Sequence, residues 1–214
     1  MKFLIYTLLC LIPNARAEDS FSIKRLEAKY KSAKSLEADF VQEVFQATLA
    51  KVKTSKGNIR LRKPGSVRWE IYEPEASIMV SNGRKLWYYT PNAGTKGKGQ
   101  VIERSANELS KQPLFQILTG TSGLEKAFTV VKTEAKEEKE LTEVTLKPKQ
   151  SSGPLELVRL TVDDKYLISE VFLKNTTGNT TKISLLNQHL DATFPAVLFN
   201  FVPPAGVDVI KNQD

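Results

Sequence analysis

The sequence predicts a mainly β protein with a few helices, folded as one domain around a meander sheet. Two observations lead to this fold class. Short segments rich in β-branched and aromatic residues recur at near-regular spacing through most of the chain. Turn residues such as Gly, Pro, Asn and Asp separate these segments, and apolar positions alternate within several of them. About a dozen such strands in one domain predict a meander sheet that is curved or closed.

The N-terminus has the pattern of a secretory signal peptide over residues 1–17. Lys2 is followed by the apolar run Phe3 to Ile12, and Ala15-Arg16-Ala17 provides a small-x-small cleavage site. The run is too short to span a bilayer, although a short membrane anchor or a buried helix is the alternative. Cys10 follows two leucines, where a lipid-modified cysteine would need a small residue before it. We therefore expect a secreted chain that starts at Glu18.

Residues 18–214 are expected to form a single domain. Cys10 is the only cysteine, so the secreted chain has none and depends on its hydrophobic core for stability. The whole chain is 41% hydrophobic and 26% charged, as in an ordinary globular protein. Without Lys2 and Arg16, 29 basic and 24 acidic residues remain, a net charge of +5. The basic residues are scattered, so the composition does not predict nucleic-acid binding.

A helix is expected first, over Asp19 to Ala33. Asp19 or Ser20 can cap it, and its apolar residues lie roughly on one face. After this helix the pattern changes to strands, and Asn82-Gly83 between two apolar runs is typical of a hairpin. The first six expected strands are Leu36–Phe45, Lys53–Leu61, Ser66–Tyr72, Ser77–Val80, Lys85–Tyr89 and Gln100–Glu103.

A helical interruption is expected next. Ser105 and Glu108 have the spacing of a capping box, Pro113 suits a first helical turn, and Gly120 is a natural stop. From residue 128 the pattern of strands resumes. The remaining expected strands are Phe128–Thr133, Leu141–Leu146, Leu155–Val162, Leu167–Leu173, Thr180–Leu186 and Phe199–Val202.

Apolar residues alternate along three neighbouring expected strands, so that one face of each strand is apolar. A partly closed sheet has a large concave apolar face, which helices must cover or which becomes a binding site. Alternation alone leaves open whether this face packs into a dry core or surrounds a cavity. The residues that share a face within each strand are Val67, Trp69 and Ile71; Ile78 and Val80; and Leu86 and Tyr88, with Trp87 and Tyr89 on the opposite face of that strand.

The sequence shows no pattern of a catalytic site. His189 is the only histidine, so no histidine cluster can bind a metal. No cysteine follows residue 17, and no G-x-S-x-G motif is present. Asp163-Asp164 is expected in a hairpin turn rather than as a catalytic pair. We therefore expect a protein that is not an enzyme and that uses neither a metal nor a cofactor.

Several motifs occur together in one order. Trp69 precedes Glu73-Pro74, then Ser77 to Gly83, then Leu86 to Pro91. This block resembles the centre of the outer-membrane lipoprotein carrier (LolA) family, and the similarity covers nearly all of residues 18–214. The other similar pieces are Ala38-Asp39-Phe40 with Gln42; Gly57; Leu61 through Pro64; Pro113-Leu114-Phe115 with Ile117-Leu118; and Phe199-Asn200-Phe201 with Pro203-Pro204 and Gly206-Val207.

The resemblance implies an incomplete antiparallel β-barrel, a half-barrel, with a helical lid over an apolar cavity. It implies a monomeric periplasmic chaperone that binds the acyl chains of lipoproteins. Its expected partners are acylated lipoproteins, an inner-membrane ABC-type lipoprotein-releasing transporter and an outer-membrane lipoprotein receptor. In the family an arginine before the proline holds the lid closed, whereas this sequence has Lys63 there, next to Arg62. Because lysine lacks the planar fork of arginine, we expect a looser lid latch or one that relies on Arg62.

Two other functions remain alternatives at this stage. One is a periplasmic lipid- or lipoprotein-sensing regulatory domain, and the other is a hydrolase of envelope lipids, which the missing nucleophile disfavours. For the carrier, the cavity residues are expected on the strands and on the two lid helices. The residues expected to bind lipid are Leu26, Phe40, Val67, Trp69, Ile71, Ile78, Val80, Trp87, Tyr89, Phe115 and Leu118.

Overall fold

The computed structural model describes residues 21–94, 98–121, 123–136, 140–150 and 153–211. The expected signal peptide, residues 1–17, therefore lies outside the described residues. The described part is mainly β with short helices, as predicted, and contains no helix that is long and apolar enough to cross a membrane. The strands are β1 (Ser35–Gln46), β2 (Lys51–Arg62), β3 (Ser66–Glu73), β4 (Ser77–Asn82), β5 (Lys85–Thr90), β6 (Gln100–Ser105), β7 (Phe128–Lys136), β8 (Leu141–Pro148), β9 (Leu155–Val162), β10 (Ile168–Asn175), β11 (Thr180–Leu190) and β12 (Asp208–Lys211).

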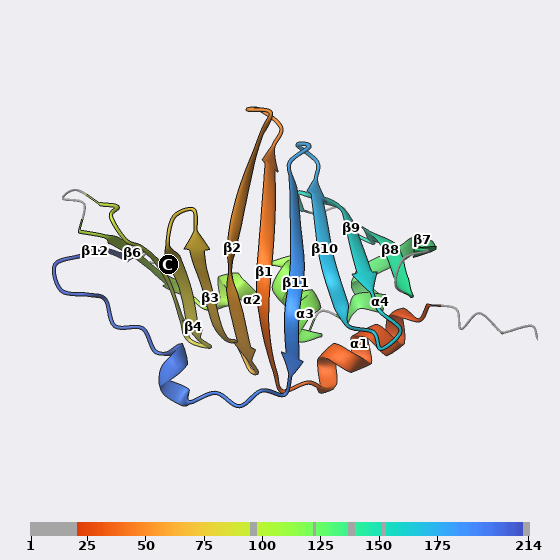
Figure 1. Cartoon of the computed structure of the whole chain (residues 1–214), viewed down its shortest axis with the longest axis horizontal. Coiled ribbons are helices and arrows are strands. Elements are labelled where there is room, and N and C mark those ends of the chain that lie inside the picture. Colours follow the sequence, from red (N-terminus) through yellow and green to blue (C-terminus); the bar gives the residue numbers. More distant parts are fainter. Residues whose placement is uncertain (1–20, 95–97, 122, 137–139, 151–152, 212–214) are drawn as a thin grey trace, which may run out of the picture.

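All of these strands form one continuous open sheet (Figure 1). Their order is β12-β6-β5-β4-β3-β2-β1-β11-β10-β9-β8-β7. Neighbouring strands are antiparallel, except that β12 runs parallel to β6. The end strands β7 and β12 do not pair with each other within the described residues. The prediction of an incomplete, antiparallel barrel is confirmed in this respect.

The first helix, α1 (Ile23–Ser32), begins later than expected. Its N-cap is Ser22, whose hydroxyl accepts a hydrogen bond from the backbone N–H of Arg25 at 3.4 Å. The proposed caps Asp19 and Ser20 lie outside the described residues. The helix buries Leu26 and Tyr30 against the sheet, and the Tyr30 hydroxyl accepts a hydrogen bond of 2.8 Å from the Ile168 N–H. One face of α1 is thereby fixed to β10.

Three short helices separate β6 from β7: α2 (Asn107–Ser110), α3 (Pro113–Thr119) and α4 (Leu124–Ala127). Pro113 opens α3 and Gly120 ends it in the left-handed conformation, as predicted. The expected capping box does not form, because the Glu108 carboxylate pairs with Arg104 at 3.1 Å instead. The sequence analysis missed α4, which has only four residues.

The C-terminal segment contradicts the prediction of a strand over Phe199–Val202. Residues Ala196–Phe199 form a 3₁₀ helix, η1, and residues 200–207 have no regular structure. Arg68 donates to the Leu198 carbonyl at 3.2 Å, so the segment is held from the sheet by side chains rather than by a strand ladder. The last strand is β12, further along the chain. A run of alternating apolar residues is equally compatible with a packed irregular segment, which explains the error.

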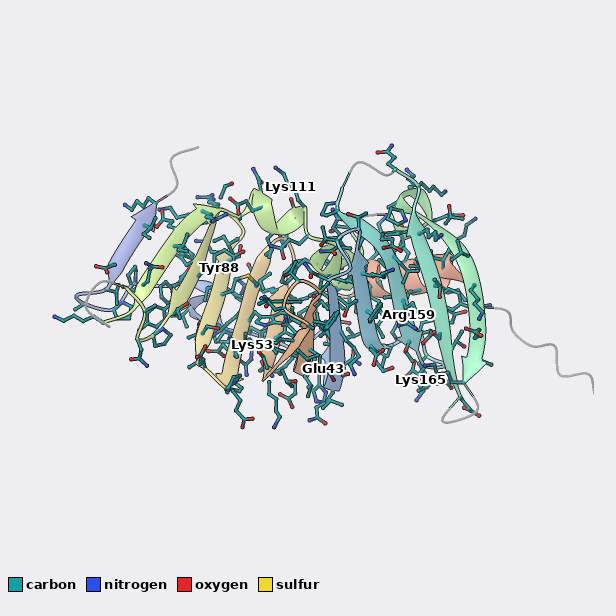
Figure 2. All side chains as sticks on the ribbon, turned by 90° about the horizontal axis from the view of Figure 1, so that it is seen from above. Glu43, Lys53, Tyr88, Lys111, Arg159 and Lys165 are labelled. Carbon is teal, nitrogen blue, oxygen red and sulfur yellow. The ribbon has the colours of Figure 1, made fainter. Side chains whose placement is uncertain are left out.

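The two faces of the sheet differ in what covers them. We call the face that carries helices α1 to α4 the inner face, and the opposite one the outer face; in Figure 2 the helices lie on one side of the sheet. A large hydrophobic cluster fills the inner face. The outer face of β1 to β3 instead carries half-buried ion pairs, with Arg60 bound to Glu37 at 2.8 Å and to Glu70 at 3.1 Å.

Candidate apolar binding cavity

An apolar cavity of about 450 Å³, the main cavity, lies between the inner face and the N-terminal turn of α3. Strands β3, β4 and β5 form one wall, and β1, β10 and β11 contribute the other. Its volume lies within the range of small-molecule binding sites, about 300–1,000 Å³. Its lining residues are Gln42, Trp69, Ile71, Ser77, Ile78, Met79, Tyr88, Tyr89, Thr90, Gln112, Pro113, Leu114, Phe115, Leu173, Thr181 and Ile183.

Two aromatic rings, Trp69 and Phe115, line the main cavity, and the buried ring of Phe40 packs behind Trp69. The Trp69 ring lies 4.2 Å from the Phe40 ring, centroid to centroid, and meets the Phe115 ring edge-on at 6.0 Å. Gly57 on β2 makes this packing possible, since a β-carbon there would lie 2.7 Å from the Phe40 ring and 1.8 Å from the Glu70 carbonyl oxygen. The aromatic group therefore depends on a glycine in the neighbouring strand.

A second cavity of about 290 Å³, the latch-side cavity, lies on the other side of Phe115. Phe115 is the one residue that lines both cavities. Val67, Leu109 and Lys63 are among the residues around the latch-side cavity. The ring of Phe115 on α3 thus separates the apolar main cavity from the region of the expected latch.

Lys63 connects the β2–β3 turn to the end of α1. Its ammonium group donates hydrogen bonds to the carbonyls of Tyr30 and, at 3.0 Å, of Lys31. These carbonyls belong to the last turn of the helix, where a cation is also favoured by the helix dipole. Burial lowers the pKa of Lys63, and the nearby carboxylate of Asp191 opposes this shift. Lys63 therefore contacts a lid helix, as the latch prediction requires.

Arg62 does not take part in this contact. Alternation along β2 directs its side chain to the outer face, where it donates to the Phe194 carbonyl at 3.5 Å and lies 4.6 Å from the centre of the Phe199 ring. The expectation that the latch relies on Arg62 is wrong for this structure. Adjacent residues on a strand point to opposite faces, so only one of the two can reach α1.

Most of the predicted lipid-binding residues lie together on the inner face. Trp69, Ile71 and Phe115 line the main cavity, and Val67 lines the latch-side cavity. The others are packed in the surrounding core or border a small pocket near the end of α1. These are Leu26, Phe40 and Leu118.

Four predicted residues have outer-face positions on β4 and β5, and two of them, Ile78 and Tyr89, also border the main cavity. Val80 and Trp87 form a second buried cluster with Val101, and Ile78 and Tyr89 pack against it. The prediction that Val80 and Trp87 face the cavity is therefore wrong.

The pairing between strands explains this error. Trp69 is opposite Met79, and Met79 is opposite Tyr88, so these three side chains share the inner face. Sequence reasoning missed Met79, Tyr88, Leu173 and Ile183 as cavity residues. The alternation of Leu86 and Tyr88 along their strand indicated that Tyr88 lies on an apolar face. It did not indicate which of the two faces of the sheet is the inner one.

The titratable groups at the cavity do not form an acid–base pair. Burial raises the pKa of Tyr88, and a hydrogen bond with Gln112 opposes this effect. Burial also raises the pKa of Tyr30 above its usual range. His189 is exposed on β11, and within the described residues no cluster of His, Cys, Asp and Glu could hold a metal ion. The arrangement suits burial of an apolar ligand rather than chemistry on it.

An open β-sheet with helices over an apolar cavity defines a class of protein that shelters an apolar ligand. Residues 31–202 match the family described as outer membrane lipoprotein carrier protein LolA. An outer-membrane lipoprotein carrier protein from Dechloromonas aromatica is 32% identical over 96% of this chain and 92% of its own length. The chain belongs to the LolA family. It is a non-enzymatic lipoprotein carrier, which decides between the three functions considered from the sequence.

A further relative and a solved structure are similar to this chain. The outer-membrane lipoprotein carrier protein from Chromobacterium violaceum is 28% identical over 90% of this chain and 88% of its own length. A crystal structure of a LolA superfamily protein from Nitrosomonas europaea aligns with a TM-score of 0.45 and 12% identity, over 83% of this chain and 95% of that one. Carriers of the LolA family are periplasmic, and their cargo is lipoprotein.

Proposed function

We propose that the main cavity binds an acyl chain of the lipoprotein cargo. The observation that supports this most directly is the apolar wall of a partly open cavity, formed by Trp69, Ile71 and Met79 and partly covered by Phe115 of α3. Each buried methylene contributes about 0.8 kcal/mol, so a chain of about 15 methylenes gains roughly 12 kcal/mol over water. A cavity that excludes water can supply this burial, whereas a flat surface cannot.

The size of the cavities supports a movement of α3 when more than one acyl chain enters. A cavity of about 150 Å³ accepts one benzene molecule, so a chain of about 16 carbons needs roughly 400 Å³. The main cavity, at about 450 Å³, therefore holds about one chain. Further chains of a triacylated lipoprotein need the latch-side cavity as well, and the ring of Phe115 must be displaced to join the two.

Lys63 acts as the lid latch in this proposal. Its hydrogen bonds to the carbonyls of Tyr30 and Lys31 hold the end of α1 against the β2–β3 turn. The end of α1 in turn packs closely against Gly120, since a β-carbon there would lie 2.5 Å from the Lys31 nitrogen. Release of Lys63 would free both α1 and the adjacent end of α3.

The proposed function includes secretion of the chain and transfer of cargo between two membrane partners. The chain is secreted after removal of residues 1–17, acts as a monomer, accepts lipoproteins from an inner-membrane ABC-type transporter and passes them to an outer-membrane receptor. In this proposal the transfer from carrier to receptor uses no nucleotide. The receptor must therefore bind the cargo more tightly than the carrier does. The mass of the protein purified from periplasm, with Glu18 as its first residue, tests the first step.

A pair of adjacent substitutions tests acyl binding. Ile71 lines the main cavity, whereas Tyr72 lies next to it on the outer face and is 57% exposed. Ile71→Glu places a carboxylate in the apolar cavity and should leave the purified carrier without bound lipoprotein. Tyr72→Glu is the matched control and should retain it. Native mass spectrometry of both variants, with circular dichroism to verify folding, measures the difference; equal cargo in folded forms of both would contradict the proposal.

A further inference from the structure

The inner face changes from apolar to polar along the strands. On β1 the residues facing inward are apolar up to Phe40 and then include Gln42 and Gln46. On β2, the partners of Gln42 and Val44 are Ser55 and Lys53. The end of the sheet near α1 is therefore apolar, and the end near the β1–β2 hairpin is polar.

A pocket of about 340 Å³, the polar pocket, lies at this polar end. It adjoins the main cavity, since Gln42, Ile71, Ser77 and Thr90 line both. The side chains of Lys53 and Glu75 meet across its rim with 3.4 Å between nitrogen and oxygen, and both are largely exposed. A ligand that fills the main cavity can therefore continue into a polar environment without leaving the protein surface.

A free strand edge borders the same pocket. Strand β3 pairs with β2 only from Lys56 to Arg62, so the segment Lys51–Ser55 of β2 is paired on one side only, with β1, within the described residues. In Figure 1 the β1–β2 hairpin rises clearly above β3. Alternate residues of such a segment direct their N–H and C=O groups away from the paired strand. These groups are available to an additional extended chain.

We propose that the Lys51–Ser55 edge and the polar pocket bind the polypeptide of the cargo, in extended form, where it follows the acylated end. The proposal rests on acyl binding in the main cavity. The first peptide groups of a lipoprotein must leave an apolar cavity, and each amide buried without a hydrogen bond costs about 1–3 kcal/mol. An added strand on β2 satisfies these amides through backbone hydrogen bonds, which depend little on the peptide sequence.

The charges at the rim agree with such a ligand. Lys53 and Glu75 neutralise each other, so the pocket favours neither an acidic nor a basic peptide. A carrier with several different cargoes needs contacts with the backbone rather than with particular side chains. Within the described residues, the sheet's end strands β7 and β12 also have an edge without a paired strand, but neither contributes to the lining of the main cavity.

Two ligands and one matched pair of variants test this site. The ligands are a triacylated cysteine amide and the same group followed by a short polar peptide. Ala76 is exposed and lines the polar pocket but not the main cavity, so Ala76→Trp should obstruct the polar pocket and leave the main cavity open. Ala135→Trp, on the exposed strand β7, is the control.

We expect the wild-type protein and Ala135→Trp to bind the peptide-bearing ligand about tenfold more tightly than the amide, which corresponds to about 1.4 kcal/mol. Ala76→Trp should bind the amide normally and lose the difference. Amide hydrogen exchange at Lys51–Ser55 should slow only with the peptide-bearing ligand. Equal affinities in the wild type, or an undiminished difference in Ala76→Trp, would overturn the peptide site while leaving acyl binding intact. Failure of both ligands to bind the wild type would overturn acyl binding itself.

Discussion

The inner and outer faces of β3 to β6 use the same kind of alternating aromatic sequence for different purposes. On the inner face, Trp69 contacts Phe115 of α3, and the helix leaves a cavity of about 450 Å³ beside it. On the outer face, Phe201 of the C-terminal segment lies 6.2 Å from the Trp87 ring and 5.7 Å from the Tyr89 ring, measured between centroids. The two faces differ in the segment that packs against them. An irregular segment follows the outer surface closely, whereas a short rigid helix cannot fill the inner one.

Replacement of one tryptophan on each face gives the largest expected effect. Trp69 and Trp87 are equally buried, each 7% exposed. Trp69→Ala and Trp87→Ala should each lower the free energy of unfolding by about 3–5 kcal/mol, because a large buried side chain is lost. Only Trp69→Ala should weaken lipoprotein binding. Denaturant unfolding and cargo retention by mass spectrometry measure the two effects, and loss of cargo in both variants would remove the functional distinction between the faces.

Lys63 and Arg62 allow a similar comparison at the end of β2. Lys63→Met removes hydrogen bonds to α1 and should destabilise that helix by about 1.5–3 kcal/mol, the usual contribution of a hydrogen bond that involves a charged group. Arg62→Met removes a contact with the Phe199 ring, worth about 0.5–1 kcal/mol. Amide hydrogen exchange should increase in α1 for the first variant and in η1 for the second. Faster exchange in α1 for Arg62→Met would contradict the assignment of one residue to each face.

Groups on the two faces should also make the stability of the fold depend on pH, one at acid and the other at alkaline pH. This effect should be smaller than those of the tryptophan and Lys63 substitutions. Hydrogen bonds from Asn187 and Asn58 lower the pKa of Asp39, and Lys85 lowers that of Glu103, both on the outer face. Their contribution is present above a pH of about 4 and is lost as the pH falls through their lowered values.

On the inner face, burial raises the pKa of Tyr30, so the native state keeps this proton longer than the unfolded state. Stability should therefore fall as the pH rises above about 10. Asp39→Asn should reduce the acid dependence and Tyr30→Phe the alkaline dependence of the melting temperature. If Tyr30→Phe left the alkaline dependence unchanged, the inner-face tyrosine would not be its source.

Much of the fold could be predicted because its signals are local. Turn residues such as Asn82-Gly83 and Pro113 mark where strands and helices end or begin, and alternation marks each strand. The predictions failed where the outcome depends on which of several possible partners a side chain or segment takes. Glu108 pairs with Arg104 rather than capping α2, and the segment around Phe199 is held by Arg62 and Arg68 instead of a neighbouring strand.

The sequence by itself determined most of the strands, the alternation of Trp69 with its neighbours and the membership of the LolA family, since these are properties of short segments and their order. Only the tertiary structure decided that Met79 and Tyr88, rather than Val80 and Trp87, share the cavity face. An alternating strand has two faces, and the register with its neighbour selects the buried one. The same long-range pairing decided that Lys63 reaches α1 and that the edge of β2 remains free beside the polar pocket.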